Sequence, residues 1–257
     1  MEALAAALTP EVLGPAASLL LIAASFFTSA MTAGFGVGGG LALMALMGVF
    51  LPVAALIPVH GVVQLGSNAG RAALLRVHVD RGFLLAFLPG ACLGAAVGGS
   101  VVVALPETLL KIVLAGFVLA LVWGPKPSAG RGLAGPWGAA GGGAVTTALT
   151  MFLGATGPLV AALISVQGFG RETVVATNAG AMTAQHLLKT LVFGIVGFAW
   201  ADWAPLIAAM VCTGYLGTRA GAGLLRRMPE SRFRAAFRIG LTILAANLAL
   251  QAIRGAS

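Results

Sequence analysis

Charged residues are scarce in this chain of 257 residues. Asp, Glu, Lys and Arg make up 9% of it, whereas a typical soluble domain contains about a quarter charged residues. Hydrophobic residues make up 59%, and the mean hydropathy is +1.01. We therefore expect an all-α integral membrane protein, most of which lies in the lipid bilayer. The net charge of +8 does not indicate a nucleic-acid partner, because the basic residues flank apolar segments.

Residues that form disulfides or bind metals are few as well. The two cysteines, Cys92 and Cys212, lie in apolar runs and are expected to be packing residues. The three histidines are His60, His78 and His186. This composition predicts neither a disulfide framework nor a metal site, and we expect no cofactor. Because neither cysteine has a basic neighbour in the sequence, we also expect no catalytic residues and no enzyme activity.

Carboxylates are absent from the middle of the apolar segments. All of them stand at segment ends, as Glu2, Glu11, Asp80, Glu107, Glu172, Asp202 and Glu230. A cation pathway or a carboxylate proton relay is therefore not expected. Any proton coupling would fall to His60 or His186, the only side chains in the apolar segments that titrate near neutrality. The first residues also lack the positive charge of a signal peptide, so we expect no cleaved leader.

Long apolar segments recur along the chain, and a spanning helix needs about 20 such residues. The long candidates are Leu13–Ala33, Val53–Leu75, Gly82–Ala104, Leu109–Trp123, Leu133–Phe152, Thr173–Phe198, Ala204–Leu225 and Phe233–Ile253. Two short apolar runs, Leu41–Leu51 and Leu159–Gln167, each follow a break rich in Gly or Pro, at Gly34–Gly40 and Gly154–Pro158. We therefore predict a polytopic, multi-pass protein in which each break turns a helix back as a hairpin.

The two breaks correspond to each other. In one alignment of the chain on itself, Thr28, Ala30, Thr32, Gly36, Gly39 and Leu41 fall on the identical residues Thr146, Ala148, Thr150, Gly154, Gly157 and Leu159. The same alignment places Arg71 on Lys189, and a slightly larger offset later places Leu105–Glu107 on Met228–Glu230. We predict a single membrane domain of two repeats, 1–124 and 125–257, each a Gly-broken hairpin followed by three transmembrane helices.

The positive charges predict how these repeats lie in the membrane. Basic residues cluster in the loop of Arg71, Arg76 and Arg81, in the linker of Lys126 and Arg131, and around Arg226 and Arg227. Such clusters lie in the cytoplasm, and we place Arg171 and Arg219 there too, whereas the acidic loops at Leu105–Glu107 and Trp200–Trp203 are then external. Corresponding loops of the two halves fall on opposite sides. This is the inverted repeat typical of secondary transporters.

Each hairpin turn is a candidate anion site. The glycines allow two helix arms to turn tightly, and the second arm begins with its N-terminus and free N–H groups aimed inward. We expect Gly39 and Gly40 in the first turn, and Thr156 and Gly157 in the second, to contact the substrate. The alternative is that the glycines only permit close helix packing, which we expect for Gly90, Gly94, Gly98, Gly99, Gly214, Gly217 and Gly221.

The helix after each hairpin carries a stripe of polar side chains. The first stripe contains His60, Gln64, Ser67, Asn68 and Arg71, and the second contains Thr177, Asn178, Gln185, His186 and Lys189. Polar groups are unfavourable against lipid, so the stripes should face each other or a cavity. We predict that all of them except Ser67 and Thr177 bind substrate, with Arg71 and Lys189 as a symmetric basic pair. Interhelical hydrogen bonds and snorkelling of the two cations remain the alternatives.

These features together resemble the sulfite exporter TauE/SafE family. The resemblance rests on the duplicated glycine-containing hairpins, on PVHGVVQLGSNAGRAALLRVHVD and on its partner ATNAGAMTAQHLLKTLVFG, and it extends from about Ser25 to Ile253. It implies export of small sulfur-containing anions (sulfite, sulfoacetate, thiosulfate or related organosulfonates) across the bacterial inner membrane. The repetition is imperfect, because Gly38, Gly40 and Gln64 correspond to Thr156, Pro158 and Met182.

Several other functions are compatible with parts of this pattern. An anion channel would use the same cavity open to both sides. A membrane-embedded enzyme would need a nucleophile with a base or a metal cluster, and a non-transporting subunit would not need a duplicated polar stripe. We therefore favour a secondary transporter working by alternating access. An exposed apolar flank would allow a homodimer.

Overall fold

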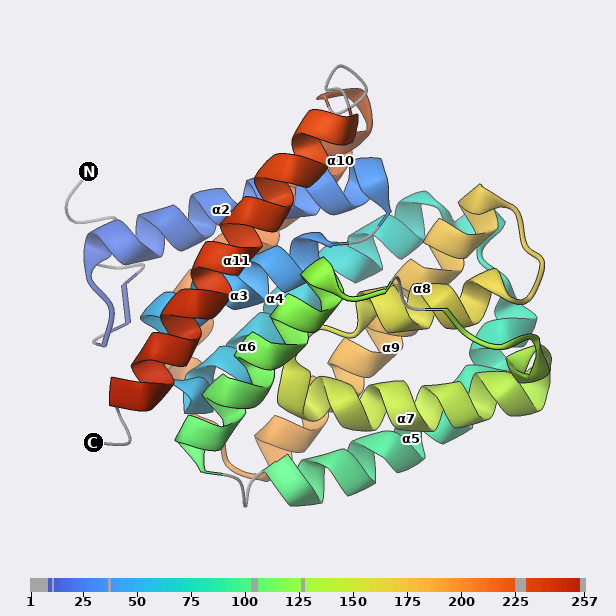
Figure 1. The fold of residues 1–257 in the computed structure, drawn as a ribbon, viewed down its shortest axis with the longest axis horizontal. Helices are drawn as coiled ribbons and strands as arrows, with labels where there is room; N and C mark the ends of the chain where they lie inside the picture. Colours follow the sequence, from blue (N-terminus) through green and yellow to red (C-terminus); the bar gives the residue numbers. More distant parts are fainter. Residues whose placement is uncertain are drawn as a thin grey trace.

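The computed structural model describes residues 9–10, 12–36, 38–102, 106–125, 128–224 and 230–254, without the side chains of 102, 107, 222–224, 230–238 and 254. Regular secondary structure in these ranges is entirely helical, which confirms the all-α prediction. Figure 1 shows helices α2 (Pro15–Phe35), α3 (Gly39–Phe50), α4 (Val53–Leu74), α5 (Arg81–Val102), α6 (Glu107–Trp123), α7 (Pro136–Leu153), α8 (Gly157–Ser165), α9 (Arg171–Ile195), α10 (Ala204–Leu224) and α11 (Glu230–Arg254). Short 3-10 turns stand at η1 (Arg76–His78), η2 (Arg131–Leu133) and η3 (Trp200–Trp203).

The two glycine-rich breaks end helices where the sequence predicts. Helix α2 stops at Gly36 with a φ of 88°, and helix α7 stops at Gly154 with a φ of 71°. Glycine adopts this left-handed region without steric cost, so it is the common residue after a helix C-terminus. The short helices α3 and α8 then begin at Gly39 and Gly157, before the apolar runs themselves.

Glycine also sets how closely the long helices approach one another. A side chain at Gly94 of α5 would collide with the Ala144 carbonyl oxygen of α7, and one at Gly217 of α10 would collide with the Phe26 carbonyl oxygen of α2. Gly90, Gly98 and Gly221 make the same kind of approach to a backbone carbonyl, whereas a Cβ at Gly99 or Gly214 would meet a side chain, that of Val192 or of Ser25. The packing interpretation of these glycines is therefore confirmed. Both pairs, α5 with α7 and α2 with α10, run parallel, because residue numbers rise together along each contact.

We expect Gly94→Ala to lower the melting temperature, because the added methyl group forces α5 away from the α7 backbone. Gly116→Ala in α6 is the matched control, since a methyl group there meets no atom within 4 Å. Alanine is favoured over glycine inside a helix by about 0.5–1 kcal/mol, so this control should be neutral or slightly stabilising. Thermal unfolding of the two purified variants in detergent measures the difference. Equal melting temperatures would contradict the close-packing account.

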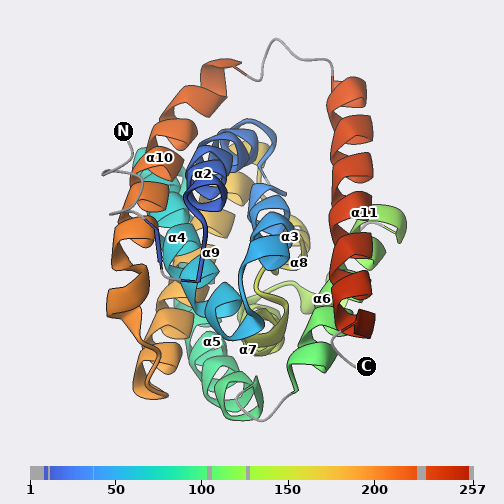
Figure 2. The same ribbon diagram turned by 90° about the vertical axis from the view of Figure 1, so that its left-hand side faces the viewer.

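Helices α4 and α9 cross at the centre of the protein and are surrounded by the other helices. They run antiparallel, since Gly61 contacts Lys189 while the Asp80 backbone N–H, just beyond α4, bonds Thr177 Oγ1 at 2.9 Å. Figure 2 shows α6 and α11 together on one side, where Trp123 Nε1 donates to Thr242 Oγ1 at 2.9 Å. All of the predicted polar-stripe residues lie on the two central helices.

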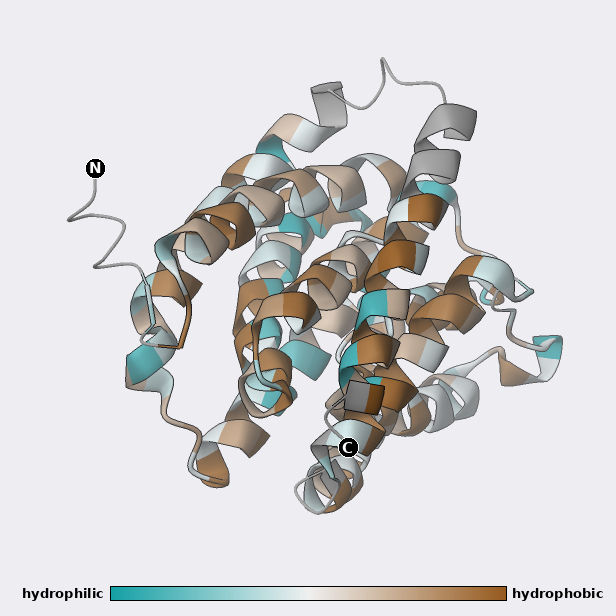
Figure 3. Cartoon of the chain, turned by 60° about the vertical axis from the view of Figure 1, so that its left-hand side comes forward, coloured by the Kyte–Doolittle hydropathy of each residue, from teal (hydrophilic) through white to brown (hydrophobic). Residues whose placement is uncertain are grey.

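The outer surface is strongly apolar. Large side chains such as Phe27, Leu93, Trp137 and Ile195 are mostly exposed, and hydrophobic residues line most helices in Figure 3. A surface of this kind needs lipid around it. Cys92 and Cys212, expected to be packing residues, are free and exposed on this surface.

Length and hydropathy together single out two spanning helices within the described part of the chain, Pro15–Phe35 and Arg81–Val101. The apolar helices Gly39–Phe50, Thr108–Trp123 and Ile239–Ile253 are shorter. Among the remaining candidates from the sequence, α4 and α9 carry buried polar side chains that lower their hydropathy. Their polar faces turn inward, as a cavity-lining helix in a membrane protein requires.

Candidate functional site

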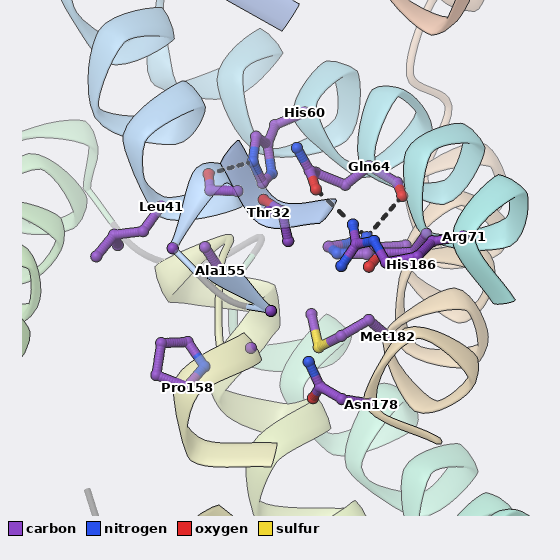
Figure 4. Close-up of a pocket in the computed structure, with 15 residues that line it drawn as sticks. Thr32, Leu41, His60, Gln64, Arg71, Ala155, Pro158, Asn178, Met182 and His186 are labelled. Atoms are coloured by element: carbon purple, nitrogen blue, oxygen red, sulfur yellow. Dashed lines mark hydrogen bonds between the residues drawn. The ribbon is translucent and has the colours of Figure 1, made fainter. Parts of the chain in front are cut away.

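A small cavity lies at the centre of the protein, where the two helix breaks meet α4 and α9 (Figure 4). Its volume is about 30 Å³. Its walls are formed by Thr32, Gly36, Gly38, Gly40, Leu41, His60, Gln64, Asn68, Arg71, Ala155, Gly157, Pro158, Asn178, Met182 and His186. Both hairpin turns and both polar stripes therefore contribute to one site, as the sequence predicts.

Arg71 is the charged residue of this wall. Its side chain is only 3% exposed, and none of its three guanidinium nitrogens has a hydrogen-bond partner. An isolated buried cation is strongly unfavourable, so buried charges in proteins are normally paired or bound to an ion. Among the described residues that line the cavity there is no Asp or Glu. The guanidinium fork is therefore available to an anion from outside the chain, and its geometry suits a planar or pyramidal oxyanion.

Two buried histidines face each other across the cavity. The rings of His60 and His186 lie 6.0 Å apart between centroids and meet edge to face at 76°. His60 Nε2–H donates to the Gly40 carbonyl oxygen at 2.9 Å, which leaves Nδ1 without a partner. His186 Nδ1 is also unpartnered. Both free nitrogens can accept a proton and then donate to a bound anion, which makes them the candidates for proton coupling.

The amide side chains complete the polar wall. Asn68 Nδ2 donates to the Gln64 backbone oxygen at 2.8 Å and to Gln64 Oε1 at 3.3 Å. The two amides are thereby fixed to each other on α4, and Figure 4 shows Gln64 and Arg71 on the same side of the cavity. Asn178 comes from the opposite helix, α9, and its Oδ1 is buried without a partner. The cavity thus holds hydrogen-bonding groups from both central helices.

The structure brings most of the predicted site residues together. Gly40, His60, Gln64, Asn68, Arg71, Gly157, Asn178 and His186 line the cavity, whereas Gly39, Thr156, Gln185 and Lys189 do not. Gly39 lies where any side chain would collide with the Thr28 carbonyl oxygen, so its role is to let the hairpin arms close. Thr156 Oγ1 donates to Gln185 Oε1 at 3.1 Å, and Gln185 Nε2 donates to Thr146 and Thr147 Oγ1 at 2.8 and 2.9 Å. These two residues fasten the second hairpin to α9.

Lys189, predicted as half of a symmetric basic pair with Arg71, is hydrogen-bonded within the protein. It is fully buried, and its Nζ donates to the Gly154 carbonyl oxygen at 2.9 Å and to Thr150 Oγ1 at 3.2 Å. Both acceptors belong to the C-terminus of α7, where the helix dipole favours a cation. Arg71 lies beside the corresponding residues Thr32 and Gly36 without bonding to either. The two cations therefore stand at aligned positions in the sequence, but only Lys189 forms hydrogen bonds within the protein.

Sequence reasoning left several wall residues unassigned. Thr32, Gly36, Gly38, Leu41, Ala155, Pro158 and Met182 also line the cavity. The alignment of the two halves could have identified two of them, because it pairs Met182 with Gln64 and Pro158 with Gly40, which were predicted to bind substrate. Both members of each pair lie in the wall. Polar character alone could not identify them, since most of these residues are apolar or glycine.

Comparison with protein-family models gives a match over most of the chain. A family model described as Sulfite exporter TauE/SafE matches residues 21–248. No curated protein and no solved structure matches the chain. The matched range covers both hairpins, both polar stripes and all the residues of the cavity wall.

Proposed function

The chain belongs to the sulfite exporter TauE/SafE family of membrane transporters, and from this premise we propose a specific activity for it. The protein is a secondary transporter that exports sulfite or a related small sulfur-containing anion, such as thiosulfate or sulfoacetate. It spans the bacterial inner membrane several times and works by alternating access. This activity requires substrate binding but no covalent chemistry, in keeping with a transporter family.

The buried, unpartnered guanidinium of Arg71 carries this proposal. An unpaired cation in the protein interior is unfavourable unless an opposite charge compensates it, and an anionic substrate supplies that charge. His60 and His186 line the same cavity, each with an unpartnered Nδ1. An oxyanion with several acceptor oxygens can accept from the Arg71 guanidinium and from both histidines at once, once the histidines are protonated.

The arrangement of helices supports two inverted repeats, 1–124 and 125–257. In Figure 1, α2 runs from left to right, whereas the corresponding helix α7 runs from right to left. Gly94 in the first half packs closely on Ala144 in the second half. The residues aligned with these two are Gly217 in the second half and Phe26 in the first half, and they make the same close contact with the two halves interchanged. Such exchange is expected when two repeats are related by a two-fold axis in the membrane plane.

The grouping of the connecting loops supports the predicted sidedness. The Gly135 N–H before α7 bonds Gln167 Oε1 at 2.8 Å in the α8–α9 loop, and the α4–α5 loop reaches α9 through the bond from the Asp80 N–H to Thr177. These three loops lie to the right in Figure 1, away from η3 and the start of α6 at the lower left. Arg76 and Arg131 lie within them, and Arg81 and Arg171 begin the helices that follow. We assign this basic end to the cytoplasm. The other residues used for orientation, Lys126, Arg226, Arg227, Leu105 and Met228–Pro229, lie outside the described residues, as do Glu2 and Glu11.

Flux of radiolabelled sulfite, thiosulfate and sulfoacetate into liposomes that contain the purified protein tests the proposal. We expect saturable flux with counterflow, in which unlabelled anion on one side drives uptake of labelled anion from the other. Imposing a pH gradient shows whether a proton moves with the anion. Flux that never saturates would indicate a channel, and failure to transport every sulfur anion tested would contradict the proposed substrate class.

A further inference from the structure

A second, larger space adjoins the Arg71 cavity. It has a volume of about 270 Å³ and is lined by Phe35, Gly36, Ala161, Ser165, Arg171, Val174, Val175 and Asn178. Gly36 and Asn178 also belong to the wall of the Arg71 cavity, so the two spaces share a boundary. We call this larger space the vestibule.

The vestibule leads from a basic surface toward the interior. Arg171 stands exposed at the first position of α9, and no ion pair involves it among the described residues. The adjacent carboxylate of Glu172 is paired with His78 Nε2 at 3.4 Å instead. At the inner end lies the buried side-chain amide of Asn178, which also lines the Arg71 cavity. An anion moving inward would thus pass from an exposed cation to a buried amide and then to Arg71.

The boundary between the two spaces is narrow. A Cβ placed on Gly36 would lie only 3.2 Å from Val175 Cγ2. Gly36 also needs its positive φ to end α2, so a side chain there would be strained as well as crowded. The narrow boundary between Gly36 and Val175 therefore separates the vestibule from the Arg71 cavity.

The corresponding place in the first half of the chain is filled. The alignment that pairs Gly36 with Gly154 pairs the vestibule residues Phe35, Ala161, Ser165, Arg171, Val174 and Val175 with Leu153, Leu43, Met47, Val53, Leu56 and Ile57. All six of these partners are buried. A side chain at Gly154 would collide with Met44, whereas one at the aligned residue Gly36 would only come close to Val175 Cγ2. One repeat thus has an open vestibule, and the other has an apolar plug of Leu43, Met44, Met47 and Leu56.

We propose that the vestibule is the cytoplasmic access path by which a small oxyanion reaches Arg71, and that the apolar plug is the closed gate on the periplasmic side. This inference rests on the proposed function and adds the route and the state of the transporter. The structure is then the inward-open state of the alternating-access cycle, and the outward-open state requires the plug to separate while the vestibule closes. The two gates differ chemically, because Ser165 and Arg171 on the cytoplasmic side correspond to Met47 and Val53 on the other.

Thiol labelling tests the route directly. In a chain that lacks the exposed Cys92 and Cys212, Ser165→Cys places one thiol in the vestibule. A membrane-impermeant, anionic maleimide added to the cytoplasmic face joins this thiol as a thioether, with the thiol proton passing to the maleimide carbon, and the unreacted reagent is washed away before sulfite is supplied. We expect modification to abolish most of the sulfite flux, and bound sulfoacetate, which does not react with the maleimide, to slow the modification. Undiminished flux after complete modification would overturn the access path.

Met47→Cys is the matched variant at the corresponding position of the plug. We expect this buried thiol to resist the reagent at rest and to react from the periplasmic face only while sulfoacetate, which leaves the reagent intact, is being transported. Labelling at rest as fast as during transport would contradict a gate at the plug. If Met47→Cys does not fold, Val53→Cys reports on the same buried region. Sulfite flux of the cysteine-free parent is measured first, so that failure of the whole function is distinguished from failure of the route.

A second variant tests the role of Arg171. We expect Arg171→Gln to raise the KM for sulfite presented at the cytoplasmic face several-fold, to weaken its dependence on salt and to leave kcat unchanged, as expected for a charge that attracts the substrate without binding it in the final site. Arg131→Gln, another exposed cation at the same end of the protein, is the control and should leave all three quantities unchanged. An unaltered KM in Arg171→Gln would show that the anion does not pass this residue.

Discussion

Replacing Arg71 by methionine is expected to abolish anion transport without lowering the melting temperature of the protein. The guanidinium is buried and makes no hydrogen bond in the folded chain, so its removal breaks no contact within the protein. Replacing buried charges by apolar side chains of similar size is commonly neutral or stabilising by about 1–4 kcal/mol. Transport should nevertheless be lost, because the cavity then offers its anion no fixed positive charge.

Sulfite counterflow in liposomes and thermal unfolding in detergent measure the two effects on the same preparation. Arg76→Met is the matched control, since Arg76 is exposed in the loop that follows α4. We expect this control to retain wild-type flux. Arg71→Lys should recover part of the transport, because it keeps the charge but not the two-pronged hydrogen bonding of arginine. Wild-type flux in Arg71→Met would contradict the site, and unfolding of the variant would show that Arg71 has an unrecognised structural role.

Lys189→Met should give the opposite pattern, although Lys189 occupies the corresponding position in the second half. Its Nζ donates to the Gly154 carbonyl oxygen and to Thr150 Oγ1. Removing it leaves a buried carbonyl group unsatisfied at the end of α7, which typically costs about 1–3 kcal/mol, and the helix dipole loses its cation. We expect a lower melting temperature and sulfite binding that persists in the fraction of protein that remains folded.

Thermal unfolding and sulfite affinity of Lys189→Met therefore separate a structural residue from a binding residue. Arg131→Met, at an exposed position, controls for the loss of one positive charge. A stable Lys189→Met protein that no longer binds sulfite would restore Lys189 to the binding site. That result would support the symmetric basic pair that the repeat alone suggests.

Much of this architecture follows from local sequence features. The helix breaks at Gly36 and Gly154 were predictable, because only glycine readily adopts the backbone conformation that ends α2 and α7. The polar face of α4 was predictable as well, since His60, Gln64 and Asn68 recur at helical spacing in an apolar segment. Helical periodicity also required these side chains to point in one direction, and the structure places all three in the cavity wall.

The different hydrogen bonding of Arg71 and Lys189 could not be predicted in this way. Both are long basic side chains at aligned positions, and sequence cannot show which of two flexible cations reaches a helix terminus and which remains free. Gln185 and Thr156 were assigned to the substrate for the same reason, yet they bond to each other. Packing between helices decides whether a polar group faces a ligand or another side chain. The spacing of residues within one helix carries no information about this packing.

The difference between vestibule and plug likewise depends on three-dimensional packing. Met47 and Leu43 are larger than their counterparts Ser165 and Ala161, and this favours a filled space in the first half. The volume left between α2, α8 and α9 still depends on the positions of whole helices, which residue size does not determine.

The central claim is that the cavity at Arg71 binds an anion. Calorimetric titration of sulfite into the purified wild-type protein and into Arg71→Met tests it most directly, because binding is measured without any assumption about direction, coupling or gating. We predict one saturable site per chain in the wild type, with sodium chloride at equal ionic strength giving no comparable signal, and no measurable binding in a folded Arg71→Met protein. Equal sulfite binding by the two folded proteins would contradict the account.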